Sequence, residues 1–210
     1  MAETIETARR GSNSRGRRSR ERLLRAAADC FGERGYSATR ISDITAAAGM
    51  SQGAFYRHFK DKNDILVEAL REPLDELLAT TAVGAGLEID RAALTAGNTA
   101  FFAIYARHRK VMRVIREAAA LHEPGLVELW LGVRGKYVER IVRWLQELQA
   151  AGRLETRDVQ LMAEALGSVL DQMAYTRIGL STAPTSEQEI ELLGQVTGEI
   201  WYRALRGSSL

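Results

Sequence analysis

Apolar residues recur at intervals of three and four positions over most of this 210-residue chain. The pattern is longest between residues 124 and 150, where it includes Leu126, Leu129, Trp130, Val133, Tyr137, Ile141, Trp144, Leu145 and Leu148. Such spacing is typical of an amphipathic helix rather than a strand. Because only three prolines interrupt the chain and β-branched runs are scarce, we predict an all-α fold of about nine helices.

Capping and turn residues divide this pattern into segments. Gly35, Gly49 and Gly152 are suitable helix stops, and Ser51 and Asp61 are suitable N-caps. We predict helices over residues 18–34, 40–48, 52–59, 62–80, 91–106, 109–121, 124–150, 156–180 and 187–207. Pro73 should bend the fourth helix. Residues 80–90 should form a loop, whose Gly84-x-Gly86 lacks the third glycine and the preceding strand of a dinucleotide site.

The composition excludes several classes of protein. A single cysteine, Cys30, cannot form an internal disulfide and fits a reducing compartment. No apolar run approaches the ~20 residues of a membrane span, and no hydrophobic stretch follows the cationic N-terminus as in a secretory signal. We therefore expect a soluble cytoplasmic protein that is not associated with a membrane.

Catalytic and metal-binding patterns are not apparent. The three histidines, His58, His108 and His122, are far apart in the sequence, and no cysteine or carboxylate cluster has ligand spacing. No nucleophile elbow or phosphate-cradling loop is recognisable. We predict no catalytic residue, no metal site, no cofactor and no enzymatic activity.

The charge is unevenly distributed. Residues 1–62 carry a net charge of +6 and residues 63–210 a net charge of −4. A basic first third suggests contact with a polyanion, although an accidental imbalance on a solvated surface would look the same.

We divide the chain into a flexible basic arm (residues 1–17, with Arg9, Arg10, Arg15 and Arg17), a helix-turn-helix domain (18–64) and a ligand-binding and dimerisation domain (65–210).

The segment Thr39 to Lys62 has the lengths, caps and glycine of a helix-turn-helix. Thr39 should cap its first helix, and Phe55 and Phe59, four residues apart, should be buried. The remaining residues would then face DNA: Thr39, Arg40, Ser42, Ser51, Gln52, Gly53, Ala54, Tyr56, Arg57, His58 and Lys62. Gln52 could bind adenine and Ala54 a thymine methyl group. Tyr56, His58 and Lys62 would bind phosphates, although His58 could also pack on the next helix and Lys62 could be a solvated lysine.

These residues carry a family resemblance. The stretches FGERGYSATR and TRISDITAAAGMSQGAFYRHFKDKNDIL resemble the DNA-binding signature of the TetR family of transcriptional regulators over about residues 18–66. Gly49, Ser51, Gly53, Tyr56, His58, Phe59 and Lys62 match in spacing, whereas Thr45 stands where the family usually has alanine. The resemblance implies an all-helical homodimer with a variable ligand domain, most often a repressor released by a small molecule. It also implies that Arg40, Gln52, Ala54, Tyr56, His58 and Lys62 lie at the DNA.

The C-terminal two thirds should bind a partner chain and an effector. Residues 156–180 and 187–207 are apolar on several faces, so we expect them to form the homodimer interface, with an ordinary monomeric core as the alternative. Two recognition helices would then read a palindrome in double-stranded DNA, ~34 Å apart or a multiple of that. An apolar or amphipathic effector is expected among Phe101, Phe102, Tyr105, Met112, His122, Trp130, Tyr137 and Tyr175, although such residues are more often core. A helical enzyme or carrier with a vestigial helix-turn-helix, or a protein-interaction adaptor, remains the functional alternative.

Overall fold

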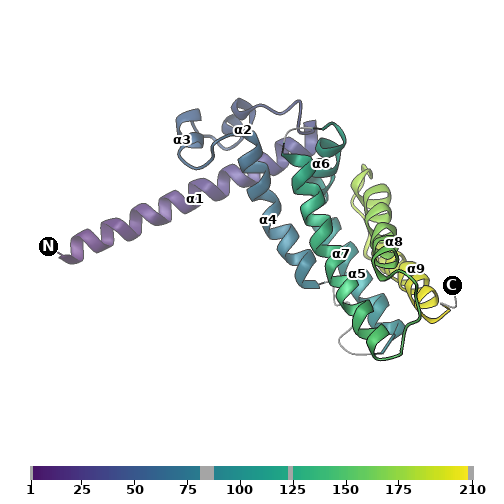
Figure 1. Ribbon diagram of the computed structural model, residues 1–210. Coiled ribbons are helices and arrows are strands. Elements are labelled where there is room, and N and C mark those ends of the chain that lie inside the picture. The colour runs from purple at the N-terminus through teal and green to yellow at the C-terminus, as the bar shows by residue number, and fades with distance from the viewer. Residues whose placement is uncertain (1, 81–87, 123–124, 208–210) are drawn as a thin grey trace.

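A computed structural model describes residues 2–80, 88–122 and 125–207, with the side chains of residues 2–14 and 80 left undescribed. Within these residues the chain is all-α, which confirms the predicted fold class (Figure 1). Its elements are α1 (Ala2–Arg34), α2 (Ile41–Ala47), α3 (Gln52–Tyr56), α4 (Lys62–Thr80), α5 (Arg91–Arg107), α6 (Arg109–Ala120), α7 (Leu126–Ala150), α8 (Val159–Met173), the π-helical segment η1 (Ala174–Gly179) and α9 (Glu187–Arg206).

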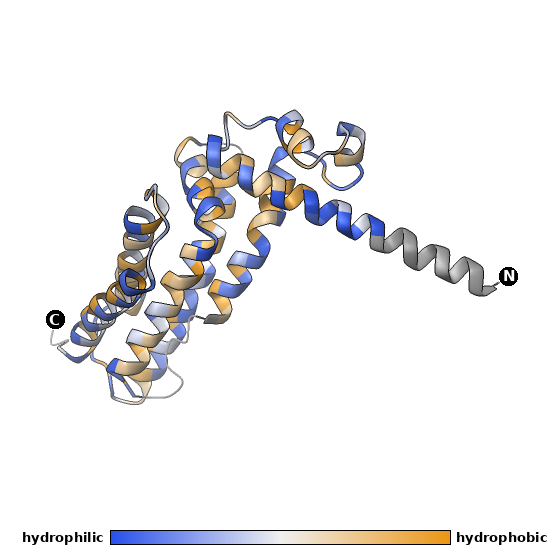
Figure 2. Cartoon of the chain, turned by 180° about the vertical axis from the view of Figure 1, so that it is seen from behind, coloured by the Kyte–Doolittle hydropathy of each residue, from blue (hydrophilic) through white to orange (hydrophobic). Residues whose placement is uncertain are grey.

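The first helix begins much earlier than predicted. The sequence indicated a flexible arm over residues 1–17 and a helix start at Arg18, but the backbone of α1 is helical from Ala2. The segment has no proline, and its alanine, glutamate and arginine residues favour a helix, which continues through Gly11 and Gly16. In Figure 2 the first coloured turns of α1 are hydrophilic, and hydrophobic residues begin where this helix reaches the other helices.

The N-terminal helices contribute one end of a continuous hydrophobic core. Leu23, Ala27 and Phe31 of α1 are fully buried, as are Ile44 of α2 and Phe55 of α3. α1 also packs against α4 and α6. Because α4 continues into the larger bundle, the predicted domain boundary at residues 64–65 lies inside this helix, and Pro73 lies buried in its second half.

The larger bundle contains a close crossing of α5 and α9 that the sequence analysis missed. Gly194 and Gly198 of α9 lie against Thr99 and Thr95 of α5, and a Cβ atom on Gly194 would come within 1.8 Å of Thr99 Oγ1. At the same crossing the buried Asn98 side chain donates to Thr197 Oγ1 at 3.2 Å. The paired glycines therefore fix how closely these two helices approach.

Several other boundaries differ modestly from prediction. The predicted helix over residues 156–180 is α8 followed by η1, so its last turn is wider than an α-helix. α7 has Gly125 as its N-cap, whereas Pro124 and residues 81–87 of the predicted loop lie outside the described residues. No helix in the described part of the chain combines the length and hydropathy needed to cross a bilayer.

Candidate nucleic-acid interface

A tight turn between α2 and α3 sets the angle of the helix-turn-helix. Gly49 adopts a left-handed φ of 60°, and the Met50 N–H donates to the Thr45 carbonyl at 2.8 Å. Ser51 Oγ then accepts the Ala54 N–H at 3.2 Å, which caps α3 as predicted. The hydroxyl of Thr45 donates to the Ser42 carbonyl at 3.1 Å, so it does not disturb the packing of α2.

The start of α2 differs from prediction. Its N-cap is Arg40, whose N–H donates to Asp43 Oδ2 at 2.9 Å, rather than Thr39. Thr39 is only 1% exposed, because its hydroxyl donates to the carbonyls of Gly35 at 2.7 Å and Cys30 at 3.1 Å. In the free chain the Thr39 hydroxyl therefore holds the end of α1 and the residue after it, and its predicted contact with DNA stays a prediction.

The inner face of α3 anchors it to the hydrophobic core. Phe55 and Phe59 are buried, with ring centroids 5.6 Å apart, as predicted. Ala54 is only 9% exposed, so little of its methyl group faces solvent, and its predicted contact with a thymine stays a prediction. α3 ends at Tyr56 rather than at Phe59.

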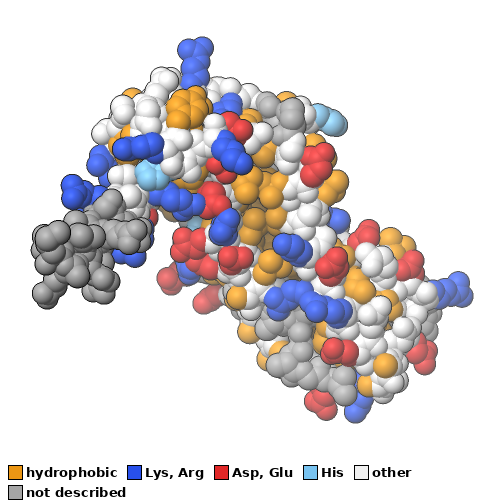
Figure 3. Space-filling model, turned by 60° about the vertical axis from the view of Figure 1, so that its left-hand side comes forward, with side chains coloured by type: hydrophobic (Ala, Val, Ile, Leu, Met, Phe, Trp, Pro, Cys, Tyr) orange, Lys and Arg blue, Asp and Glu red, His pale blue; other side chains and the backbone are white. Residues whose placement is uncertain are grey.

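The outer face of α3 is polar and exposed. Gln52, Gly53 and Arg57 are exposed, and Tyr56 is 57% exposed although it is a large aromatic side chain. Arg40, Ser42 and Ser51 are also exposed and flank the same turn. Figure 3 shows several Lys and Arg side chains at the end of the molecule that α1 to α3 form. This end combines hydrogen-bonding groups with positive charge, as a DNA-reading surface requires.

His58 is half-buried beside Phe59, with ring centroids 6.4 Å apart. Burial lowers the pKa of His58, and the nearby cations Arg57 and Arg20 lower it further. The imidazole is therefore mostly neutral near pH 7 in the free protein and can still donate one N–H.

Lys62 is bound within the protein. Its Nζ donates to the Tyr36 carbonyl at 2.9 Å and lies 4.0 Å from the centroid of the Tyr36 ring. The beginning of α4 is capped by its own carboxylates, because Asp61 Oδ1 accepts the Asp64 N–H at 2.8 Å. A phosphate at the start of α4 would compete with these hydrogen-bond partners. Lys60, two residues before Lys62, is exposed and was not among the predicted DNA-binding residues.

Comparison with known proteins agrees with this geometry. Residues 23–69 match the family model described as bacterial regulatory proteins, tetR family. Residues 91–195 match the model described as AefR-like transcriptional repressor, C-terminal domain. An HTH-type transcriptional regulator of Mycobacterium tuberculosis is 30% identical over 173 residues, which cover 82% of this chain and 89% of that protein.

The chain belongs to the TetR family of transcriptional regulators. The HTH-type transcriptional repressor KstR2 of Rhodococcus jostii is 35% identical over 140 residues, 65% of this chain and 63% of that protein. The regulator PfmR of Thermus thermophilus has the same fold, with a TM-score of 0.69 at 23% identity over 86% of this chain and 97% of that one. A TetR-family protein of Syntrophomonas wolfei gives a TM-score of 0.72 at 18% identity, over 92% and 97% of the two chains. Membership confirms the prediction of a DNA-binding regulator rather than an enzyme.

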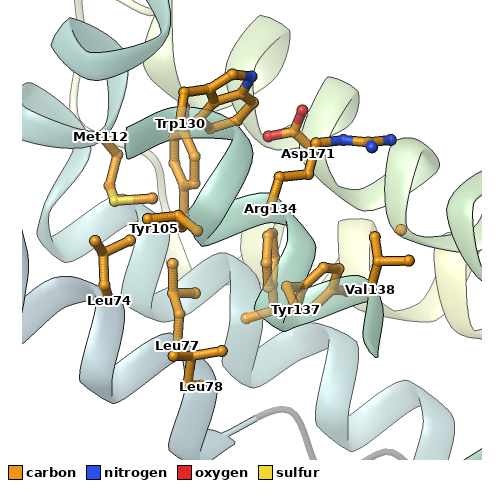
Figure 4. A pocket seen from close by; sticks show the side chains of 13 residues that line it. Leu74, Leu77, Leu78, Tyr105, Met112, Trp130, Arg134, Tyr137, Val138 and Asp171 are labelled. Carbon is orange, nitrogen blue, oxygen red and sulfur yellow. The ribbon is translucent and has the colours of Figure 1, made fainter. Parts of the chain in front are cut away.

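Side chains of α4 to α8 in this TetR-family regulator line a mostly apolar cavity of about 50 Å³. Figure 4 shows its lining side chains. Five of the eight residues predicted for an effector site line it: Phe101, Tyr105, Met112, Trp130 and Tyr137. The sequence analysis missed Leu74, Leu77, Leu78, Val133, Arg134, Val138, Gly167 and Asp171. The α4 leucines could have been found from their helical spacing, but nothing in the sequence marks Arg134 and Asp171 as neighbours.

The other three predicted effector residues lie elsewhere. Phe102 is fully buried in the core, where its ring is 5.7 Å from that of Phe101. His122 is exposed just after α6, with a φ of 57°. Tyr175 packs under the guanidinium of Arg116, with 4.1 Å between Arg116 Cζ and the ring centroid. These residues are not part of the cavity wall.

Proposed function

We propose that this TetR-family regulator is a dimeric repressor that binds a palindromic operator and responds to a small molecule in the C-terminal cavity. The observation that carries the proposal is the rigid two-faced structure of α3. Phe55 anchors one face in the core, while Gln52, Tyr56 and Arg57 are exposed on the other. A short helix held in this way can enter a major groove without first becoming ordered.

The DNA contacts can be divided by type. Gln52 and Gly53, at the start of α3, lie closest to the turn and would meet base edges, where an amide can bind adenine in a bidentate manner. Tyr56, Arg57, His58 and the flanking residues Arg40, Ser42 and Ser51 would bind phosphates and fix the register. Lys62 would act mainly by positioning α4, and Lys60 would supply the cation beside it.

Two exposed apolar surfaces support dimerisation through α8 and α9. Leu192, Val196 and Ile200 of α9 are 58%, 44% and 43% exposed and recur every four residues. Leu161 of α8 is 64% exposed, with the exposed Ala165 one turn later. Apolar stripes of this kind are typical of a protein interface, and a second copy would cover both at once.

Two helices connect the cavity to the DNA-binding end. α4 lines the cavity with Leu74 and Leu77 and begins at Lys62, beside α3. α6 lines it with Met112, and two of its other residues reach α1: Lys110 pairs with Asp29 at 2.7 Å, and Arg113 donates to the Gly32 carbonyl at 2.7 Å. An effector that separates α4 from α6 would therefore move α1 and α3, and a coupling of about 1–3 kcal/mol would change DNA affinity roughly 5- to 150-fold.

A titration of labelled DNA from upstream of the protein's own coding sequence tests the proposal. We expect a dimer to bind a palindrome within it far more tightly than a scrambled duplex, with affinity falling steeply as salt increases. Arg57→Gln should weaken binding to all sequences, whereas Arg153→Gln, at an exposed position after α7, should not. Equal affinity for scrambled DNA, or equal effects of the two variants, would refute specific binding through α3.

A further inference from the structure

The polar groups of the cavity restrict the chemistry of an effector. The wall is almost entirely leucine, valine, methionine and aromatic side chains, so a ligand must be mainly apolar. Besides the indole of Trp130, four side chains with polar atoms interrupt it: Tyr105 of α5, Arg134 and Tyr137 of α7, and Asp171 of α8. Burial and the charge of Asp171 both raise the pKa of Tyr105, so its phenol is protonated. What each of these already binds determines what it can offer to a ligand.

Arg134 contributes its stem more than its charge. Its guanidinium donates to Ser168 Oγ at 2.7 Å. Figure 4 shows this group beyond Asp171, far from Leu74 and Met112 at the opposite end of the cavity. The aliphatic part of Arg134 therefore covers the wall, while the charge lies against α8.

Asp171 is a carboxylate with weak partners. Its side chain is only 22% exposed, and its hydrogen bond from Arg116 Nη1 is long, at 3.4 Å. Arg116 is itself engaged by Gln172 Oε1 at 2.6 Å and by the Tyr175 ring. Burial raises the pKa of Asp171, although Arg116 and Arg134 oppose this effect. The carboxylate therefore retains most of its capacity to accept hydrogen bonds.

Tyr137, in contrast, carries a hydrogen-bond donor that has no acceptor in the described part of the chain. Its hydroxyl is buried and has no hydrogen-bond partner among the described residues. Its ring lies against Gly167, where a Cβ atom would come within 3.1 Å of the ring. Gly167 is one helical turn before Asp171, so the Tyr137 ring of α7 lies against the face of α8 that carries Asp171. Burial and the charge of Asp171 both raise the pKa of Tyr137, which keeps the phenol protonated and able to donate.

We propose that the effector is an uncharged amphiphile, with a compact apolar body and one hydroxyl group that donates to Asp171 and accepts from Tyr137. A hydroxyl is the simplest group that does both at once. The inference rests on the proposed effector cavity and adds the chemical class of its ligand.

Charged head groups fit the same place poorly. An anion would be repelled by the Asp171 carboxylate, and a cation would compete with Arg116, which already pairs with that carboxylate at 3.4 Å. Either ion would also lose its hydration in a cavity with few polar groups. An ether or ketone could accept from Tyr137 but would leave Asp171 without a donor. Because the cavity is about 50 Å³, the effector must also be small or must displace wall residues such as the half-buried Trp130.

Four probes with eight carbon atoms each test the head group directly: octanol, heptyl methyl ether, octanoate and octylammonium. Their affinities for the full-length protein can be measured from tryptophan fluorescence, since Trp130 lines the cavity. We expect octanol to bind about tenfold or more tightly than each of the other three. A preference for octanoate or octylammonium, equal binding of octanol and ether, or no binding of any probe would overturn the inference.

Two variants assign the preference to these side chains. Asp171→Asn should bring the affinities of octanol and ether close together, because an amide can also donate to an ether. Tyr137→Phe should lower the affinity for octanol by a few fold and leave the protein folded. The matched control is Asp75→Asn, at an exposed position on α4 outside the cavity, which should leave the preference unchanged. An unchanged preference in both cavity variants would also overturn the inference. Operator binding measured without probes would show separately whether the proposed regulator function stands.

Discussion

Lys62 Nζ donates to the Tyr36 carbonyl at 2.9 Å and lies over the Tyr36 ring, so the first residue of α4 is attached to the segment between α1 and α2. The neighbouring Lys60 is exposed. Lysines two residues apart thus have different tasks: Lys62 holds the helix-turn-helix on α4, and Lys60 remains available to solvent or to a phosphate.

The two lysines can be separated by substitution. Lys62→Gln should lower the free energy of unfolding by about 1–2 kcal/mol, because a charged hydrogen bond and a cation–π contact are lost. Lys60→Gln should change stability by less than about 0.5 kcal/mol but weaken DNA binding and reduce its salt dependence. Thermal unfolding and DNA titrations measure both effects. If instead Lys62→Gln weakened DNA binding and Lys60→Gln lowered the free energy of unfolding, Lys62 would be primarily a DNA ligand.

DNA binding should depend on the protonation of His58. Burial, Arg57 and Arg20 hold its pKa below the ordinary 6.5, so the free protein carries a neutral imidazole near pH 7. A phosphate beside the ring would favour the protonated form, and binding would take up a proton. Affinity should therefore rise as the pH falls from about 8 to about 6, and His58→Gln should flatten this dependence.

The same depressed pKa acts in the opposite direction on folding. The native state binds fewer protons than the unfolded state below pH 6.5, so this residue lowers stability as the pH falls through that range. The DNA titration therefore needs a parallel unfolding measurement at each pH. An affinity that does not change with pH would place His58 away from the phosphates.

Glycine positions distinguish a close helix crossing from an ordinary helix interior. Gly194→Ala should destabilise the protein by about 1–3 kcal/mol, because the new methyl group would overlap Thr99 of α5. Gly132→Ala, in α7, has no heavy atom within 4 Å of the new Cβ and should stabilise by about 0.5–1 kcal/mol. At about 2–4 °C per kcal/mol, thermal unfolding resolves both changes. A harmless Gly194→Ala would contradict the close approach of α5 and α9.

The exposed stripe on α9 predicts the oligomeric state. Ile200→Glu should weaken the dimer by at least about tenfold, because it places a charge in an apolar interface. Leu121→Glu is the matched control, since Leu121 is 66% exposed at the end of α6, far from this stripe in the sequence. Analytical ultracentrifugation of both variants measures the effect. A wild-type monomer, or equal dissociation of the two variants, would contradict the proposed interface.

The sequence predicted the helices well because their signals are local. The apolar periodicity of α7 and the caps Ser51 and Asp61 depend on residues within one or two turns. Helix starts without such signals were harder to predict, and α1 begins far before the predicted Arg18 and continues through Gly11 and Gly16, where glycine alone does not end a helix.

The site was predicted less completely, because its details depend on contacts between distant segments. Thr39 is polar and Ala54 is small, so both are compatible with a surface position, but both are buried. The Thr39 hydroxyl turns inward, where it donates to the carbonyls of Cys30 and Gly35. The pairing of Lys62 with Tyr36 spans 26 residues. The placement of Tyr137 and Asp171 on one wall likewise arises from the packing of α7 on α8, which periodicity alone does not specify.

The most direct measurement is the affinity of wild type and Gln52→Ala for a complete set of single-base substitutions in the operator. We expect the wild-type profile to be palindromic, with each critical base pair costing about 1–3 kcal/mol when changed. In Gln52→Ala, that penalty should disappear at one symmetric pair of positions and persist at the others. The exposed Gln146 of α7 supplies the control, since Gln146→Ala should reproduce the wild-type profile. A Gln52→Ala profile identical to wild type, or a wild-type profile without symmetry, would contradict the reading of bases by two copies of α3.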